Sequence, residues 1–163
     1  MSQAIDTSKA ERRKLWFDSI DEALADVDRI VEAERAGTLR QTGNWTAGQV
    51  LGHLASWVEY GYDGYPMKPL PFFLRRILRW KVKQFLVEGL PGGVRIPGVG
   101  AGTYGVEVIP AEEGADRLRR AFGRLKSGER CGHESPAFGP MSHEDRIALN
   151  LRHAELHLGF LQP

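Results

Sequence analysis

Apolar residues recur three or four positions apart in four segments of the chain, and glycine- or proline-containing stretches separate these segments. In the first segment the repeating apolar positions are Ile20, Leu24, Val27 and Val31. A capping-box pattern, Ser-Ile-Asp-Glu at 19–22, precedes them, and Gly37 is a typical helix stop. The pattern predicts a helix that ends before Gly37. A second capping box at 8–11 leaves two alternatives open: the helix begins earlier, or a short separate turn precedes it.

The second helix has the clearest start. Thr-Ala-Gly-Gln at 46–49 is another capping box, and Trp45 and Val50 are placed to form a hydrophobic staple around it. The apolar face of this helix is Val50, Leu54, Trp57, Val58 and Gly61. His53 lies beside that face, about two turns into the helix. A histidine that points inward needs a polar partner, and a metal ion is one candidate.

Two further helices are predicted, one from about 110 to 128 and one from the capping pattern at 142–145 to about Phe160. Residues 105–109 alternate in a way that indicates one short extended piece. The expected fold class is all-α, an up-and-down-like four-helix bundle, in which sites form between facing helices.

The segment between the second and third of these helices is harder to interpret. Residues 70–88 interleave large apolar side chains with five lysines and arginines, which is typical of a basic amphipathic helix. Such a helix lies on an anionic membrane or a partner helix, or it packs on its own domain with a solvated basic face. We favour the packed interpretation. Residues 89–105 hold seven glycines and predict a long loop that covers one mouth of the bundle.

The composition narrows the class of protein. At 163 residues the chain is expected to form a single domain over 1–163, with its core over about 19–161. The 22 lysines and arginines nearly balance 21 acidic residues, so we expect no nucleic-acid partner. Cys131 is the one cysteine, which excludes an internal disulfide, and it is either incidental or a nucleophile. The N-terminus lacks a signal-peptide pattern and no run of about 18 apolar residues occurs, so we expect a cytoplasmic protein without a membrane partner.

Candidate chemistry comes from three histidines. His153 and His157 are four residues apart in a helical segment, which places both imidazoles on one face. Two imidazoles one turn apart can chelate a divalent ion, and His53 is the obvious third ligand. A site with three histidines and an open position is of the catalytic type. Zinc, nickel, iron and copper all suit such ligands. The alternative is that these histidines are satisfied by ordinary hydrogen bonds.

The sequence also resembles a known family. Asn-Trp-Thr-Ala-Gly-Gln-Val-Leu-Gly-His-Leu-Ala at 44–55 resembles the second-helix signature of the DinB-like superfamily. The stretch at 133–142, followed by Arg-His-Ala-Glu-Leu-His-Leu-Gly-Phe-Leu at 152–161, is similar to a branch of unknown function, while 66–105 matches only loosely. The resemblance implies a four-helix bundle, often a homodimer, with a divalent ion held by one histidine of the second helix and two of the last.

Carried to this sequence, the resemblance makes His53, His153 and His157 the metal ligands. Related members include S-transferases that use low-molecular-weight thiols, and others are described as hydrolases. It therefore implies a metal-dependent enzyme that acts on a small-molecule substrate. Its cofactor would be a divalent ion, joined by a low-molecular-weight thiol if the chain acts as the thiol-dependent members do.

The general base is not evident from the sequence. Glu155 lies two residues from His153, about 200° around the helix, so it cannot act as the glutamate of a His-Glu-x-x-His site. His133, Glu59 and Tyr60 are the candidates for a catalytic base. The absence of an obvious base keeps a second hypothesis open, a non-catalytic helical bundle that binds a ligand or partner and carries a vestigial metal site.

Overall fold

The computed structural model describes residues 5–163, and within this range it is helical apart from one very small sheet. The elements in chain order are α1 (Ile20–Ala36), β1 (Arg40–Gln41), α2 (Ala47–Asp63), α3 (Phe72–Glu88), α4 (Ala111–Lys126), α5 (His143–Leu158) and β2 (Leu161–Gln162). This content confirms the all-α class. Of the described helices, none is long and apolar enough to span a membrane.

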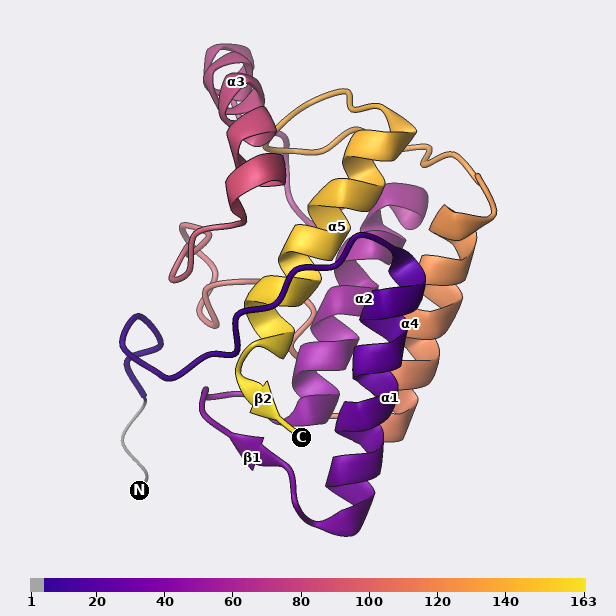
Figure 1. Ribbon diagram of the computed structural model, residues 1–163. Helices are drawn as coiled ribbons and strands as arrows, with labels where there is room; N and C mark the ends of the chain where they lie inside the picture. Colours follow the sequence, from indigo (N-terminus) through magenta and orange to yellow (C-terminus); the bar gives the residue numbers. More distant parts are fainter. Residues whose placement is uncertain (1–4) are drawn as a thin grey trace.

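Helices α1, α2, α4 and α5 lie side by side around one core, while α3 projects from one end (Figure 1). The core holds the apolar stripes that the sequence repeats predict, since the residues of those stripes are almost all buried. The largest fully buried apolar side chains are Phe122, Ile30, Leu51, Leu54, Leu118, Leu125, Leu158 and Leu161. Burying each such side chain contributes about 1.5–3 kcal/mol, so this core dominates the stability of the arrangement.

Helices α2 and α4 pack closely because each carries a glycine where they meet. A Cβ atom on Gly48 would lie 1.8 Å from the carbonyl oxygen of Ile109, and one on Gly114 would lie 2.9 Å from the Leu51 side chain. Farther along, the Arg124 guanidinium covers the Tyr62 ring at 3.8 Å. Early residues of α2 thus meet the start of α4, and late residues meet its end, so the two helices are parallel.

This direction differs from an up-and-down arrangement, in which neighbouring helices along the chain alternate. The physical reason is the long connection over 64–110, which contains α3 and the glycine-rich loop. It carries the chain back to the end where α2 began, as crossover connections do in other helical proteins. The His53 face of α2 is then left to pack against α5, which is antiparallel to it.

The helix starts agree with the capping patterns. Ser19 accepts a hydrogen bond from the Glu22 amide, Ser142 accepts one from Asp145, and Thr46 forms a full capping box with Gln49. These caps offset the unpaired amides of each first turn. The box at 8–11 forms a short separate turn, because its serine bonds to a neighbouring aspartate rather than starting a helix.

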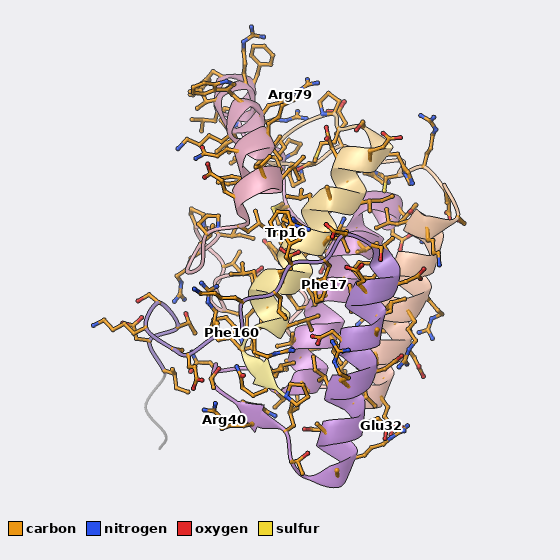
Figure 2. All side chains as sticks on the ribbon, viewed as in Figure 1. Trp16, Phe17, Glu32, Arg40, Arg79 and Phe160 are labelled. Atoms are coloured by element: carbon orange, nitrogen blue, oxygen red, sulfur yellow. The ribbon has the colours of Figure 1, made fainter. Side chains whose placement is uncertain are left out.

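The segment before α1 is tied to the core by buried charges. The Arg13 guanidinium makes two hydrogen bonds to the Asp26 carboxylate of α1, at 2.9 and 2.7 Å. On α5, Glu155 accepts from the Phe17 amide at 2.6 Å and pairs with Arg152 at 2.8 Å. Figure 2 shows Phe17 where this segment crosses the helices. Phe17 is itself buried, so the core begins slightly before the expected residue 19.

The short extended piece predicted at 105–109 does not form a strand. These residues belong to no strand or helix and Gly105 is left-handed, while the Val106 carbonyl accepts a hydrogen bond from the Gln49 side chain. The ladder in the described range joins β1 and β2, which pair antiparallel with Arg40 opposite Gln162. Both strands have two residues, too short for an alternating pattern to reveal them.

Helix α3 forms within residues 70–88, as an amphipathic helix would. We predicted that it packs on its own domain, and only one of its faces does so. Leu78 and Phe85 face the inside of the molecule and Val82 is buried. The opposite face is open to solvent, with Phe73 63% and Trp80 83% exposed. Figures 1 and 2 show how far α3 extends away from the other helices. The segment therefore keeps a large apolar surface unburied.

Candidate metal centre

Three imidazoles meet between α2 and α5. His53 comes from the middle of α2, and His153 and His157 come from successive turns of α5. One ring nitrogen from each residue can be chosen so that all three lie within 4.8 Å of one another. The ring centroids are 4.7 to 5.0 Å apart. The antiparallel packing of the two helices thus brings together residues about a hundred positions apart in sequence.

The hydrogen bonds of His53 fix which of its nitrogens is free. Its Nδ1 lies 2.8 Å from the backbone carbonyl oxygen of Tyr104. A carbonyl only accepts, so Nδ1 carries the proton and donates it, which leaves the lone pair on Nε2. Metal-bound histidines are commonly oriented by such a bond to a backbone carbonyl. The Nε2 of His53 is therefore presented to the other two histidines in the form that a metal ion requires.

Gly105 allows the Tyr104 carbonyl to approach the His53 ring on α2. It adopts a left-handed φ of +71°, and a Cβ atom there would lie 2.6 Å from the Cβ of Ser56 on α2. Any other residue would both strain the backbone and push this loop away from the helix. The loop backbone is thereby held against His53.

The spacing of the free nitrogens fits a metal ion. His53 Nε2 and His153 Nε2 are 3.2 Å apart. Two nitrogens bound at 2.0–2.1 Å to one tetrahedral ion would be about 3.3 Å apart. The same distance also suits a single hydrogen bond between the rings when no ion is bound. The donor set, its separation and the oriented tautomer all suit a divalent ion.

The environment keeps these rings neutral. Burial lowers the pKa of His53 to about 4, and the hydrogen bond to Tyr104 opposes this only in part. Burial, with repulsion from the neighbouring imidazoles, also holds the pKa values of His153 and His157 well below the usual range. Neutral imidazole is the form that ligates metal, so protons do not compete for the site near pH 7.

Two tryptophans enclose the cluster. The Trp45 ring stacks on His157, with centroids 5.3 Å apart and planes 13° apart, and it contacts His53 as well. Trp57 stands edge-on to His153 at 6.0 Å. Rings packed in this way restrict the rotamers of the imidazoles.

The cluster opens on a cavity of about 1150 Å³. Its walls are contributed by α2, α5, the inner face of α3 and much of the glycine-rich loop, so this loop lines the cavity. The cavity is large enough for a small organic molecule. Access to the histidines from solvent is through this space.

The three predicted base candidates lie elsewhere. Glu59 is paired with Arg117 of α4 at 2.6 Å, the Tyr60 ring packs against Trp57 and Tyr65, and His133 is exposed in the loop before α5. None of the three lines the cavity. Their catalytic role stays a prediction to which this geometry adds no support. Glu155 faces Phe17, away from the cluster, as its position on the helix predicts.

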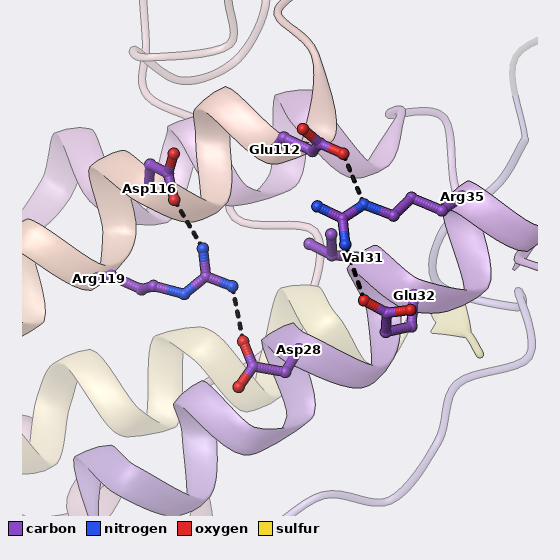
Figure 3. Close-up of a pocket in the computed structure, with 7 residues that line it drawn as sticks. All are labelled: Asp28, Val31, Glu32, Arg35, Glu112, Asp116 and Arg119. Carbon is purple, nitrogen blue, oxygen red and sulfur yellow. Dashed lines mark hydrogen bonds and ion pairs between the residues drawn. The ribbon is translucent and has the colours of Figure 1, made fainter.

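A second, smaller pocket lies between α1 and α4 (Figure 3). Its polar groups are paired with each other: Arg119 bonds to Asp28 and Asp116, and Arg35 bonds to Glu32 and Glu112. Surface ion pairs of this kind contribute little and leave no group free for a ligand. We therefore assign this pocket no chemistry.

Several cavity residues had no clear signal in the sequence. Tyr104 acts through its backbone carbonyl, which any residue has, and Tyr65 lies in the loop after α2. Arg146 also lines the cavity. It shares a helical stripe with Asn150, His153 and His157, so extending that stripe by one turn would have found it.

Comparison with known proteins identifies the family of this chain, and that family has no known function. A family model described as "Protein of unknown function (DUF1569)" matches residues 9–163. No curated protein matches the chain, and no solved structure does. The match spans every helix described above, including all three histidines.

Proposed function

Since the chain belongs to DUF1569, a family of proteins of unknown function, we propose from the geometry of the site that it is a metal-dependent enzyme acting on a small molecule. The observation that carries this proposal is the meeting of His53, His153 and His157 at the wall of a large cavity. Three neutral imidazoles with an open side are typical of catalytic rather than structural metal sites.

A divalent ion held there would lower the pKa of a water or thiol that it binds and so supply a nucleophile near neutral pH. Neighbouring residues fix the tautomer and orientation of the histidine ligands. The Tyr104 carbonyl holds the tautomer of His53, and the stacked Trp45 ring fixes the plane of His157. The cavity walls hold the substrate against the open side of the cluster.

For the reaction class we propose thiol transfer, slightly ahead of hydrolysis. This proposal rests on the resemblance to the DinB-like superfamily, in which a low-molecular-weight thiol is the co-substrate of some members. On the same resemblance we propose that the fold is a DinB-like four-helix bundle and that the protein is a homodimer. We also propose a cytoplasmic location. Zinc, nickel and iron are the metals to consider, because imidazole suits all three.

The first experiment is elemental analysis of the tag-free protein beside a His153→Ala/His157→Ala double variant. We expect close to one divalent ion per chain in the wild type and none in the variant. His143→Gln is a matched control, since this histidine lies on the same helix but bonds to the Leu125 carbonyl outside the cluster. If wild-type protein neither carries a metal nor takes one up on reconstitution, the proposal fails.

The second candidate function is a ligand-binding module without catalysis. It is favoured by the scarcity of general bases, since Asp6 is the one carboxylate among the described residues that line the cavity, and it is bonded to Ser8. A metal-loaded protein that turns over neither thiol-transfer nor hydrolytic substrates, but binds small molecules in the cavity, would support it.

A further inference from the structure

The part of the cavity next to the histidines is lined by hydrogen-bond donors. Arg146, one turn before Asn150 on α5, projects into it, and its guanidinium lies beside the Tyr65 hydroxyl. Trp57 lies between Tyr65 and His153, with ring centroids 6.3 and 6.0 Å away. A continuous row thus runs from Arg146 through two aromatic rings to the metal cluster.

The hydrogen-bond donors in this row are not fully paired with acceptors of the protein. The indole N–H of Trp57 is buried and has no hydrogen-bond partner among residues 5–163. Arg146 donates to the His133 carbonyl, but no carboxylate of residues 5–163 pairs with it. A buried donor without an acceptor is costly and calls for an explanation, and an acceptor group on a bound ligand supplies one here. Burial also raises the pKa of Tyr65 despite its arginine neighbour, so its hydroxyl keeps its proton.

The charged side chains that line the cavity are mostly positive. Its lining includes the cations Lys68, Arg95 and Arg146 against the single carboxylate of Asp6. The chain as a whole is almost neutral, so this excess is local. Much of the remaining wall is apolar, with Leu78, Phe85 and Leu149 contributing to it. Such a space suits a molecule with an acidic group and an apolar body.

Building on the proposed function, we propose that the cavity binds an amphipathic anion, a carboxylate or a phosphate ester, with its acidic group at Arg146, Tyr65 and Trp57. A guanidinium is well suited to either group because it can donate two parallel hydrogen bonds. Arg146 and His153 are seven residues apart on α5, which is roughly 10 Å along the helix. The reacting group of the ligand then lies at the histidines, about that distance from its acidic end.

The test is direct binding of four probes with the same eight-carbon chain: octanoate, octyl phosphate, octanol and octylamine. Binding to metal-loaded protein is followed by calorimetry and by the fluorescence of the cavity tryptophans. We expect the two anions to bind at least tenfold more tightly than octanol, and octylamine to bind weakest. The ratio between octanoate and octyl phosphate distinguishes the two acidic groups. Equal binding of anions and octanol would overturn the proposal.

Variants locate the acidic group. Arg146→Gln is expected to weaken anion binding at least tenfold and leave octanol unchanged, while Arg146→Lys keeps part of the preference. Arg120→Gln removes the same charge from an exposed position of α4 and is the matched control. Should Arg146→Gln fail to fold, Tyr65→Phe and Trp57→Phe each remove one donor and are expected to weaken the anions alone.

The His153→Ala/His157→Ala variant separates this inference from the metal site. Anion preference that persists in this variant and disappears in Arg146→Gln supports the inference, even if no metal is ever found. Anion preference that disappears with the histidines and survives Arg146→Gln places the acidic group at the metal and overturns it. Metal content of Arg146→Gln is expected to equal that of the wild type.

Discussion

The Nε2 atoms of His53 and His153 lie 3.2 Å apart although the residues are a hundred positions apart in the chain. His53 is fixed on α2 by a loop carbonyl, and His153 lies on α5 against the Trp57 and His157 rings. Neither helix alone can make the site. The stability of the contact between α2 and α5 and the occupancy of the site are therefore linked.

Metal binding is expected to stabilise the fold. At a free metal concentration 100 times its dissociation constant, the native state gains about 2.7 kcal/mol, and a chelator removes this gain. Thermal unfolding of wild-type protein with metal and with chelator measures the difference. His53→Ala is expected to melt at the same temperature under both conditions, while His143→Gln keeps the difference. An unchanged melting temperature after His53→Ala, with no metal bound before or after, would favour a vestigial site.

Gly105→Ala is expected to weaken the metal site without touching a ligand. The new methyl group would meet Ser56, and the left-handed φ would be strained, so the Tyr104 carbonyl moves away from His53. Loss of such a partner typically costs 10–100-fold in metal affinity. Competition with a chromophoric chelator measures it.

Gly98→Ala is the matched control for that substitution. Gly98 also has a positive φ, +80°, but an added Cβ would contact nothing there. It carries the same backbone strain and leaves His53 alone. Equal losses of metal affinity in the two variants would show that loop strain, rather than the orientation of His53, is responsible.

The elements that the sequence predicts well are those determined by neighbours in the chain. The caps at Ser19, Thr46 and Ser142 depend on contacts over three residues, and the buried stripes follow from helical spacing. His153 and His157 share a face for the same reason. Together with His53, they could be assembled into a candidate site from the sequence alone.

The features that were missed depend on distant parts of the chain. The parallel direction of α2 and α4 follows from the 64–110 connection, and no local pattern encodes it. The carbonyl that orients His53 belongs to a backbone position with no distinctive side-chain chemistry. The exposure of Phe73 and Trp80 depends on whether another element covers α3, and periodicity alone cannot tell a covered apolar face from an open one.

Asp26 is expected to be the ion-pair residue on which stability depends most. It is fully buried and bonded to Arg13 and Arg29. Asp26→Asn should cost about 3 kcal/mol in the free energy of unfolding at pH 7, because it breaks a buried pair. Urea denaturation measures this. Asp28→Asn is the control, since Asp28 is largely exposed, and should change stability by less than about 0.5 kcal/mol.

The cost of Asp26→Asn should also depend on pH. Although burial raises the pKa of Asp26, the hydrogen bonds from Arg13 and Arg29 outweigh it and hold that pKa below the usual 3.8. The folded state therefore favours the carboxylate. The contribution is fully present above pH 3.8 and is lost as the pH falls through the lowered value. The difference between wild type and variant should shrink in that acidic range, and a difference that persisted to the lowest pH would contradict the assignment.

The outward face of α3 is where we expect the proposed homodimer to form. Phe73, Ile77, Trp80 and Val87 share one face of the helix and are all exposed. An apolar surface of this kind is seldom left open on a monomer. Sedimentation should show a dimer for wild-type protein and a monomer for Phe73→Ser/Trp80→Ser. Val108→Ser, an equally exposed apolar residue outside α3, should leave the dimer intact.

Salt distinguishes this dimer from binding to an anionic membrane through the same face. Arg76, Arg79 and Lys83 are exposed on α3, and a two-fold axis through this helix would bring these like charges of two copies together. Screening reduces that repulsion, so the dimer should strengthen from 50 to 500 mM salt, whereas attraction to anionic lipid weakens over the same range. Self-association that falls with salt, together with flotation on anionic vesicles, would replace the dimer by a membrane contact. If the protein is monomeric at every salt concentration and does not float with anionic vesicles, neither a dimer nor a membrane covers α3. A different partner would then be expected to bind this face.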